Sequence, residues 1–464
     1  MKPGWLPAPI GAPQSLRDFA RVDRTVALLQ PSGLAPDAVQ RIAALASRCA
    51  DVLAADRPTE SGRISAFFVP GRIEVLGKHT DYAGGRSLIC AVDRGFVVMA
   101  MARDDRRVLV HDAVLGQHAD LILDESLPAA PGHWSDYVRT VVRRLARNFD
   151  HASGADIVLA SDLPPAAGLS SSSALVVGTF LSLAACGWLA DDPRYASVIG
   201  TPEDLAGYLA AVENGLDFAT LAGGRGVGTM GGSQDHTAIL CARPDALVRY
   251  SFAPVRAEGA VPVAHDWTFV VASSGVRAEK SAAALARYNR LAELARDAAA
   301  AWRSETGSTA PHLGAILRAG EGEALLDLLR RTTDPDAAAL TERAEQFLEE
   351  AGVIIPAAYG ALGAHDVGAF GQLVARSHYL AETKLKNQIA ETVTLAANAR
   401  SGGAAAASAF GAGFGGSVWA LVRAEDAAMF AEYWQSAYLK SFAAHRDAAV
   451  FFNSRPGPAA MRLT

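Results

Sequence analysis

The chain has 464 residues and a mass of 48.5 kDa, and its 43 Lys and Arg against 49 Asp and Glu give a formal net charge of −6 at pH 7. Half of the residues are hydrophobic and 20% are charged, which excludes a mainly disordered chain and allows a large core. The length predicts two or three domains. The pI near 6.0 and the lack of basic blocks argue against nucleic acid as the main partner, but are compatible with a small anionic ligand.

The four cysteines lie far apart and form no Cys-x-x-Cys pair, which predicts neither a zinc site nor a disulfide framework. The stretch Met1 to Leu16 lacks the apolar core of a signal peptide, so we expect a cytoplasmic protein. The uncharged stretch from Ser173 to Ala190 reaches the minimum length of a membrane span. Its glycines, Gly178 and Gly187, and the turn before it favour a buried core helix, and we expect no membrane association.

The predicted elements begin with an appendage over residues 1–60 that contains an amphipathic helix from Pro36 to Ala55. Short apolar strands follow from Ile64 and suggest an antiparallel sheet, and a strand from Asp156 to Ala160 runs into the uncharged helix. The later expected elements are strands at His236 to Leu240 and Trp267 to Ala272, a helix from Ala278 to Arg303, a largely helical stretch from Ala337 to Arg400, and a strand from Ser417 to Val422. This mixture, without regular βαβ units, predicts an α+β fold.

The segment Leu163-Pro-Pro-Ala-Ala-Gly-Leu-Ser-Ser-Ser-Ser-Ala174 is a turn of small residues that opens directly into the uncharged helix. At such a turn, backbone N–H groups and the positive end of the helix dipole face an anion, and hydroxyls offer oxygen ligands to Mg²⁺. The spacing and the lysine of a Walker A loop are absent, which weakens the P-loop NTPase hypothesis. Taken alone, a turn of this kind is more often an ordinary helix N-cap.

Two other segments combine glycines with functional groups. Pro70-Gly-Arg-Ile-Glu-Val-Leu-Gly-Lys-His-Thr-Asp-Tyr-Ala-Gly-Gly85 crowds charged and polar residues after a strand. On a loop they suit a polyhydroxylated ligand, although a solvated hairpin tip has a similar composition. Phe410-Gly-Ala-Gly-Phe-Gly-Gly-Ser417 is a glycine cluster that enters a strand, where missing side chains permit close backbone approach.

In this order the three segments resemble the motifs of the GHMP small-molecule kinases, and of their galactokinase branch in particular. Further segments similar to that branch are Trp134 to Val138, Gly228 to Asp235, Arg277 to Arg290 and Ser377-His378. The resemblance implies a two-domain GHMP kinase-like fold with the active site in the cleft between the domains. The implied parts are an N-terminal helical extension over residues 1–60, an N-terminal domain that binds the ATP phosphates over 61–250, and a C-terminal domain over 251–464.

The resemblance implies an ATP-dependent kinase that phosphorylates the anomeric C1 hydroxyl of galactose or a galactose-like sugar, with ATP and Mg²⁺ as cofactors. The residues that it places around ATP are Pro165, Gly168, Leu169, Ser170, Ser171, Ser172 and Ser173. The implied magnesium ligands are Ser172 and Glu213, although Glu213 on its own is typical of an exposed helix residue. The glycines implied to support the phosphate-binding turn are Gly411, Gly413, Gly415 and Gly416.

Asp235 matches the aspartate of the family that abstracts or orients the proton of the sugar hydroxyl, and Arg72 matches the arginine beside it. An adjacent Arg⁺ keeps a carboxylate ionised and helps to neutralise the transferring phosphoryl group, although a purely structural ion pair would use the same residues. The residues implied to bind the sugar are Lys78, His79, Asp81, Gly232 and Tyr288. His236 stands where many relatives carry Gln and has no assigned role.

Lys78 departs from the family, in which a glutamate at this position contacts the sugar near C6. A cation that only donates hydrogen bonds thus replaces a carboxylate that accepts them. A substrate that differs from galactose near C6, such as the uronate galacturonate, is therefore an alternative. Donation from Lys78 to a neutral O6, or pairing with Glu74, is also open.

A regulatory sensor that binds sugar and ATP without turnover is a further alternative from the same branch. The full-length serine turn, Asp235 and Arg72 favour catalysis over this reading. The segment His79-Thr80-Asp81-Tyr82 argues against the mevalonate and homoserine kinase branches. The expected partners are the sugar and ATP, and both a monomer and a homodimer remain open.

Overall fold

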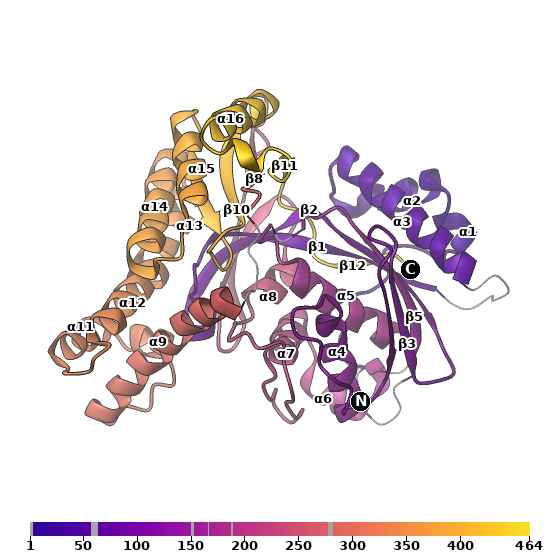
Figure 1. Cartoon of the computed structure of the whole chain (residues 1–464), viewed down its shortest axis with the longest axis horizontal. Helices are drawn as coiled ribbons and strands as arrows, with labels where there is room; N and C mark the ends of the chain where they lie inside the picture. Colours follow the sequence, from indigo (N-terminus) through magenta and orange to yellow (C-terminus); the bar gives the residue numbers. More distant parts are fainter. Residues whose placement is uncertain (1–2, 57–63, 150–152, 166, 187–188, 277–281) are drawn as a thin grey trace.

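The structure is a computed structural model that describes residues 3–56, 64–149, 153–165, 167–186, 189–276 and 282–464. These described residues form one sheet of eight strands and one of four, and helices pack on both sheets (Figure 1). The expected α+β class with two main parts is confirmed.

The eight-stranded sheet has the order β12-β1-β2-β5-β3-β4, with β6 paired to β2 and β7 paired to β6. Its strands are β1 (Ile64–Leu76), β2 (Arg86–Ala102), β3 (Arg107–Asp112), β4 (His118–Ile122), β5 (Ala155–Ser161), β6 (Ala246–Ser251), β7 (Arg256–Pro262) and β12 (Met461–Arg462). The expected antiparallel pairing is present between β1 and β2 and between β3 and β4, whereas β3 and β5 run parallel. The chain returns from β4 through helix α4 (Ser135–Asn148), and such a crossover allows parallel pairing.

Helices cover both faces of this sheet (Figure 1). On one face lie α4, α5 (Ser171–Ala185), η3 (Leu189–Asp191), α6 (Pro193–Val198), α7 (Pro202–Asn214) and α8 (Gln234–Cys241). On the other lie α1 (Leu16–Phe19), α2 (Val22–Leu29), η1 (Gln30–Ser32) and α3 (Pro36–Asp56). Successive side chains of β1 alternate between the two cores: Phe67 and Val69 join the first, whereas Ala66 and Phe68 join the second.

The N-terminal helices are therefore part of the core, and the description of residues 1–60 as an appendage is wrong for the described part of that segment. The helix expected from Pro36 is confirmed as α3. Its Ile42 and Leu53 share one buried apolar cluster with Phe68 of β1 and Met99 of β2. Without these helices the second apolar face of the sheet would meet water, which the hydrophobic effect opposes.

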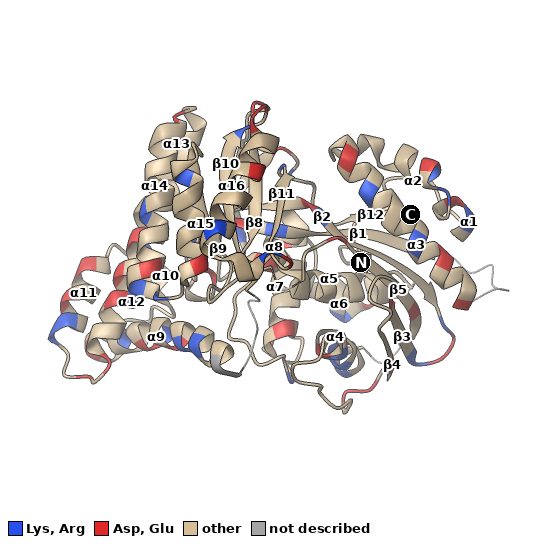
Figure 2. Ribbon diagram, turned by 45° about the horizontal axis from the view of Figure 1, so that its top comes forward, with Lys and Arg blue, Asp and Glu red and all other residues tan. Residues whose placement is uncertain are grey.

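The four-stranded sheet is antiparallel, with the order β11-β8-β10-β9. Its strands are β8 (Trp267–Ser273), β9 (Ala406–Phe410), β10 (Ser417–Arg423) and β11 (Val450–Ser454). The helices of this half are α9 (Ala282–Thr306), α10 (Leu313–Arg318), α11 (Gly322–Arg331), α12 (Ala337–Glu349), η4 (Glu350–Ile354), α13 (Ile355–Gly363), α14 (Val367–Leu380), η5 (Ala381–Leu385), α15 (Ala390–Ser401), α16 (Ala427–Ser441) and η6 (Ala443–His445). Figure 2 shows residues of both charge signs interspersed along α9, α11 and α12, in line with the balanced composition.

Several expected elements of this half are confirmed. The strands expected from Trp267 and from Ser417 are β8 and β10, and the stretch from Ala337 is largely helical. The expected helix from Ala278 is present as α9, but residues 278–281 lie outside the described residues. The expected strand from His236 to Leu240 is wrong, because these residues form α8. The apolar side chains of this helix are buried in the core of the first sheet. A short apolar run is compatible with a buried helix as well as a strand.

The division of the chain at residues 60/61 and 250/251 stays a prediction. Strands β6 and β7 pair with the first sheet, so that sheet continues to Pro262. The uncharged helix is α5, which is buried in the first core as expected. Within the described residues, every helix is too short or too polar to cross a bilayer.

Replacing Ile42 with Ala tests whether α3 belongs to the core. Ile42 is fully buried, so the variant should lose about 2–5 kcal/mol of unfolding free energy, measured by chemical denaturation. The control is Gln40→Ala on the exposed face of the same helix, which should change this value by no more than about 0.5 kcal/mol. Equal effects of the two substitutions would show that α3 is dispensable to the core.

Candidate active site

Arg72 joins the candidate catalytic aspartate to the phosphate-binding turn. Its Nε donates to Asp235 Oδ1 at 2.8 Å, and its Nη1 donates to the Gly168 carbonyl oxygen at 2.6 Å. Arg72 is only 4% exposed, whereas the Asp235 side chain is 34% exposed. The two expected catalytic residues thus lie together, and part of the carboxylate stays accessible.

From the sequence we expected Arg72 on a loop after a strand. In the structure it lies within β1 itself. The strand passes Pro70 and Gly71 by a shift of register on β2, and such an irregularity tolerates a proline. A Cβ at Gly71 would lie 2.7 Å from the Leu169 carbonyl oxygen. The missing side chain therefore lets the phosphate-binding turn pack on the strand, where Leu169 accepts a hydrogen bond from the Arg72 N–H at 3.1 Å.

The phosphate turn, which we define as residues 163–174, leads into α5 at Ser171; Ala166 lies outside the described residues. Ser170 has a left-handed backbone, with φ of 59°, and its buried Oγ has no hydrogen-bond partner among the described residues. A buried hydroxyl of this kind at a helix N-terminus suits a phosphate oxygen. Of the other residues expected here, Pro165 is exposed, Leu169 is buried, and Gly168, Ser171 and Ser172 are half-buried.

Glu213 of α7 is buried at the phosphate turn and is not an exposed helix residue. Ser173 Oγ donates to Glu213 Oε2 at 3.0 Å, and His236 Nε2 lies 3.2 Å from the same oxygen. The structure thus brings Glu213 to the turn through Ser173, one residue after Ser172, the serine expected as its fellow magnesium ligand. A carboxylate beside a row of hydroxyls is a set of oxygen donors that Mg²⁺ accepts.

The glycine cluster, residues 410–417, packs on the phosphate turn. Ser417 Oγ donates to the Ala167 carbonyl oxygen at 2.5 Å, and a Cβ at Gly411 would lie 3.2 Å from the Gly168 carbonyl oxygen. All four glycines expected here have positive φ: Gly411, Gly413, Gly415 and Gly416. The two segments lie about 250 positions apart in the chain and meet through backbone and small side chains.

The loop between β1 and β2, residues 77–85, is named the sugar loop below. In it, His79 uses both ring nitrogens within the protein: Nδ1 lies 2.9 Å from the Tyr82 hydroxyl and Nε2 lies 3.0 Å from the Ala412 carbonyl oxygen. Because a carbonyl only accepts, Nε2 carries the proton and Tyr82 donates to Nδ1. Burial, together with the charge of Arg343, lowers the pKa of His79 to about 4, so the ring is neutral. His79 therefore links the sugar loop to the glycine cluster.

Asp81 and Gly232 lie beside the candidate catalytic residue. Asp81 Oδ2 accepts a hydrogen bond at 3.0 Å from the backbone N–H of Gln234, which directly precedes Asp235 at the start of α8. A Cβ at Gly232 would lie 2.3 Å from the same Oδ2. Asp81 is half-buried, and desolvation raises the pKa of its carboxyl.

Tyr288 of α9 closes this side of the site. Its ring lies against His79, with 5.2 Å between ring centroids, and a Cβ at Gly231 would lie 3.2 Å from its hydroxyl. Tyr288 is half-buried. Asp81, Gly232 and Tyr288 are thus brought together as expected; Arg277, at the start of the segment that holds Tyr288, lies outside the described residues.

Lys78 is 1% exposed, and its ammonium has a partner inside the protein. Nζ donates to Ser377 Oγ at 3.1 Å, and Ser377 in turn donates to Glu350 Oε1 at 2.9 Å. Glu74 is also buried, and its Oε2 accepts from the Gln234 side chain at 2.8 Å. Burial raises the pKa of Glu74 to about 7, although the charges of Lys78 and Arg72 act against this rise.

Four residues that were not expected at the site bind its residues through their side chains: Gln234, Arg343, Gln346 and Glu350. Gln234 had one signal, since it directly precedes the candidate catalytic residue. The other three lie in a helical stretch in which the sequence shows no motif.

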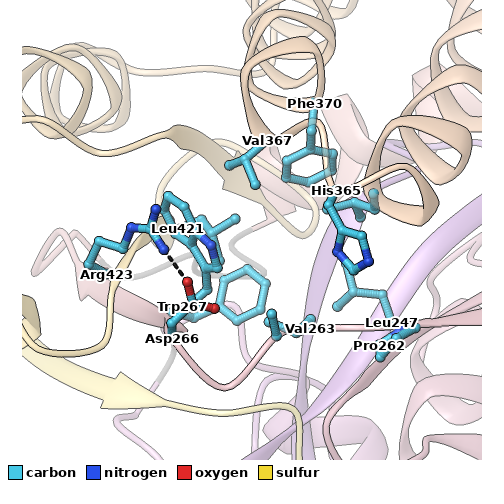
Figure 3. Close-up of a pocket in the computed structure, with 13 residues that line it drawn as sticks. Leu247, Pro262, Val263, Asp266, Trp267, His365, Val367, Phe370, Leu421 and Arg423 are labelled. Carbon is cyan, nitrogen blue, oxygen red and sulfur yellow. Dashed lines mark hydrogen bonds and ion pairs between the residues drawn. The ribbon is translucent and has the colours of Figure 1, made fainter.

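A separate pocket of about 330 Å³ lies between β8, β10 and the start of α14 (Figure 3). It is lined mainly by apolar side chains such as Val263, Trp267 and Phe370, with the Asp266–Arg423 ion pair at its edge. None of the expected sugar or phosphate residues is among those that line it, so it is distinct from the site described above.

The chain matches three family models. They are described as the galactokinase galactose-binding signature, over residues 59–102, the GHMP kinases N terminal domain, over 136–241, and the GHMP kinases C terminal domain, over 358–440. The first contains Arg72 and the sugar loop up to Gly85, and the second contains the phosphate turn, Glu213 and Asp235.

Similar proteins point the same way. The chain is 28% identical to a galactokinase from Actinobacillus succinogenes, over 76% of this chain and 84% of that protein. It is 36% identical to a Haemophilus influenzae galactokinase, over 24% of this chain and 29% of that one. The solved structure of Lactococcus lactis galactokinase complexed with galactose superimposes with a TM-score of 0.71 and 25% sequence identity. The match covers 89% of this chain and 98% of that one. Methanococcus jannaschii mevalonate kinase, 15% identical over 86% of this chain and 99% of its own length, shares the fold with a TM-score of 0.50.

The fold and the three family models place the chain among the GHMP kinases. Its signature, its relatives and its overall structure make it a galactokinase-like sugar kinase, an enzyme that transfers a phosphoryl group.

Replacing Gly232 with Ala should impair use of the sugar. The new methyl group would displace Asp81 or the adjacent Tyr82 backbone, and a misplaced binding group costs about 10²-fold in kcat/KM. The measurement is steady-state kinetics with sugar and nucleotide varied in turn, and the loss should appear with the sugar. The Gly224→Ala variant, whose Cβ would meet only Arg147 at 3.9 Å, is the control. An unchanged kcat/KM in the Gly232 variant would separate Asp81 from sugar binding.

Replacing Glu74 with Gln should change how stability depends on pH. The folded pKa of about 7 exceeds the ordinary 4.5, so Glu74 makes the unfolding free energy fall as pH rises from about 4.5 to about 7. The stability of the variant relative to the original protein should therefore increase over this window and level off above it. Urea denaturation at several pH values measures this, beside Glu432→Gln at an exposed position of α16. A difference for Glu74→Gln that is constant with pH would contradict the expectation.

Proposed function

We propose that the protein transfers the γ-phosphoryl group of ATP to the anomeric C1 hydroxyl of galactose or a galactose-like neutral sugar. The observation that carries the proposal is the double attachment of Arg72, which binds both Asp235 and the carbonyl oxygen of Gly168 in the phosphate turn. This arrangement puts a carboxylate that can receive a proton next to a turn that suits phosphate.

In the proposed reaction, Asp235 orients the sugar hydroxyl and takes its proton. The hydroxyl oxygen bonds to the γ-phosphorus as the bond from that phosphorus to the bridging oxygen of ADP breaks. Arg72 holds the Asp235 carboxylate by a hydrogen bond and offsets charge on the phosphoryl group. Because the transition state is loose in most analyses, positioning contributes more than the strength of the base.

The phosphate turn supports the choice of nucleotide and metal. The N-terminus of α5 and the Ser170 hydroxyl, which has no partner among the residues that the structure describes, offer donors to phosphate oxygens. We propose that Ser172 and Glu213 hold Mg²⁺, with Ser173 fixing the Glu213 carboxylate. When bound, the metal supplies charge neutralisation for the phosphates. A kinase that consumes ATP agrees with the cytoplasmic location expected from the sequence.

The contacts in the sugar loop favour a neutral sugar over a uronate. The Lys78 ammonium already donates to Ser377, and His79 has both ring nitrogens bonded. We propose that Asp81 and Tyr288 contact sugar hydroxyls, whereas Lys78 and His79 hold the loop. Galactose is the sugar named in the structure of the Lactococcus lactis relative.

The test is ADP release with ATP and Mg²⁺ across galactose, N-acetylgalactosamine, arabinose, glucose, galacturonate and glucuronate. We expect turnover with galactose and little with either uronate. Asp235→Asn should lower kcat by about 10²- to 10⁴-fold, because it removes the proton acceptor and leaves the shape of the side chain nearly unchanged.

The matched control is Asp297→Asn, at an exposed position of α9, which should keep the activity of the original protein. Preference for galacturonate over galactose would overturn the choice of sugar. Full activity of Asp235→Asn would overturn the catalytic assignment.

A further inference from the structure

One face of the α12–η4 helix binds the backbone of three consecutive residues at the start of the sugar loop. The contacts are Arg343 Nη2 to the His79 carbonyl oxygen, Gln346 Nε2 to the Lys78 carbonyl oxygen at 3.2 Å, and Glu350 Oε1 to the Gly77 N–H at 2.8 Å. The helix lies about 260 to 270 positions further along the chain. This match of three side chains to three successive backbone groups is more specific than one chance contact.

The spacing explains how one helix makes all three contacts. Arg343, Gln346 and Glu350 stand at i, i+3 and i+7, which places them on one helical face. They are at most 1% exposed, although Arg, Gln and Glu usually face water. A buried polar group that loses its partner destabilises the protein, so this face is tied to the sugar loop as it stands.

A side-chain connection accompanies the backbone contacts. Lys78 Nζ donates to Ser377 Oγ, and the same hydroxyl donates to Glu350 Oε1, which also accepts from the Gly77 N–H. Because an ammonium only donates, the Ser377 hydroxyl accepts from Lys78 and uses its own proton to donate to Glu350. The buried Lys78 charge is thereby balanced by the buried Glu350 charge through one hydroxyl.

A second connection reaches His79. Arg343 Nη2 also donates to the Tyr82 hydroxyl at 3.3 Å, and this hydroxyl donates to His79 Nδ1. Arg343 thus acts on both the carbonyl oxygen and the ring of His79. Two residues later in the loop, Asp81 binds the start of α8 beside Asp235.

We propose that Arg343, Gln346, Glu350 and Ser377 are positioning residues of the sugar site. They set the backbone of Gly77 to His79, and through it they hold Asp81 against the start of α8. In this network the charge of Lys78 is balanced by Glu350, and Lys78 does not bind the substrate. This inference rests on the proposed function for its effect on the sugar, but the effect on the loop itself is independent of the substrate.

The first experiment compares Glu350→Gln and Gln346→Ala with the matched control Glu349→Gln. Glu349 is the neighbouring glutamate, but it pairs with Arg376 on a more exposed face. Both network variants should raise the KM for the sugar by about tenfold or more and change the KM for ATP by less than about twofold. The control should leave both values unchanged.

The second experiment tests the charge balance by rescue. Lys78→Met and Glu350→Gln each leave one buried charge without its counterpart, and the double variant leaves neither. The double variant should therefore have a sugar KM closer to that of the original protein than the Glu350→Gln variant has. A double variant as impaired as the sum of the two single ones would overturn the balance of Lys78 by Glu350.

The third experiment measures amide hydrogen exchange in residues 77–85 without any substrate. Exchange should be about tenfold faster in Glu350→Gln than in the original protein, and unchanged in Glu349→Gln. Unchanged exchange, or an unchanged sugar KM in both network variants of an active enzyme, would overturn the inference. If exchange increases but the original protein phosphorylates none of the sugars, the proposed function fails and the positioning of the loop stands.

Discussion

The buried guanidinium of Arg72 is the constraint on which the rest of the site depends. Arginine cannot lose its proton in a protein, so its burial requires acceptors that stay in place. Asp235 and the Gly168 carbonyl oxygen are those acceptors, and they come from α8 and the phosphate turn. One side chain in β1 thus fixes the position of Asp235, the proposed proton acceptor, relative to the phosphate turn. The absence of a side chain at Gly71 serves the same contact, because it lets the turn reach the strand.

The sugar loop is also held by hydrogen bonds between its own polar side chains and partners inside the protein. Lys78 and His79 look like ligand-binding groups in the sequence, yet each finds its partners inside the protein, at Ser377, Tyr82 and Ala412. Both ring nitrogens of His79 are used in this way, and the buried Lys78 ammonium donates to Ser377, so these two side chains hold the conformation of the loop. Asp81 and Tyr288 stay half-buried beside Asp235, and these are the two side chains that we propose contact the substrate.

Buried charge also bears on the choice of sugar. Glu74 and Glu350 are buried near Lys78 of the sugar loop, and each of these three charged groups would be costly to bury alone. The carboxylates of Glu74 and Glu350 offset the charge of the Lys78 ammonium, which weakens its attraction for a uronate. The raised pKa of Glu74 is the cost of this arrangement, and the hydrogen bond from Gln234 offsets part of it.

The sequence by itself determined the features that depend on neighbours in the chain. The periodicity from Pro36 predicted α3, and the small residues before Ser171 predicted the phosphate turn and α5. The resemblance of three local motifs to those of the GHMP kinases indicated Arg72 and Asp235 as a candidate catalytic pair. Only the tertiary structure decided the features that depend on distant segments. Examples are the helical state of residues 236–240, the strands β6 and β7, and the partners of Lys78 and His79. The physical reason is that strand pairing, burial and the bonding of buried polar groups join residues hundreds of positions apart, and no local pattern records those partners.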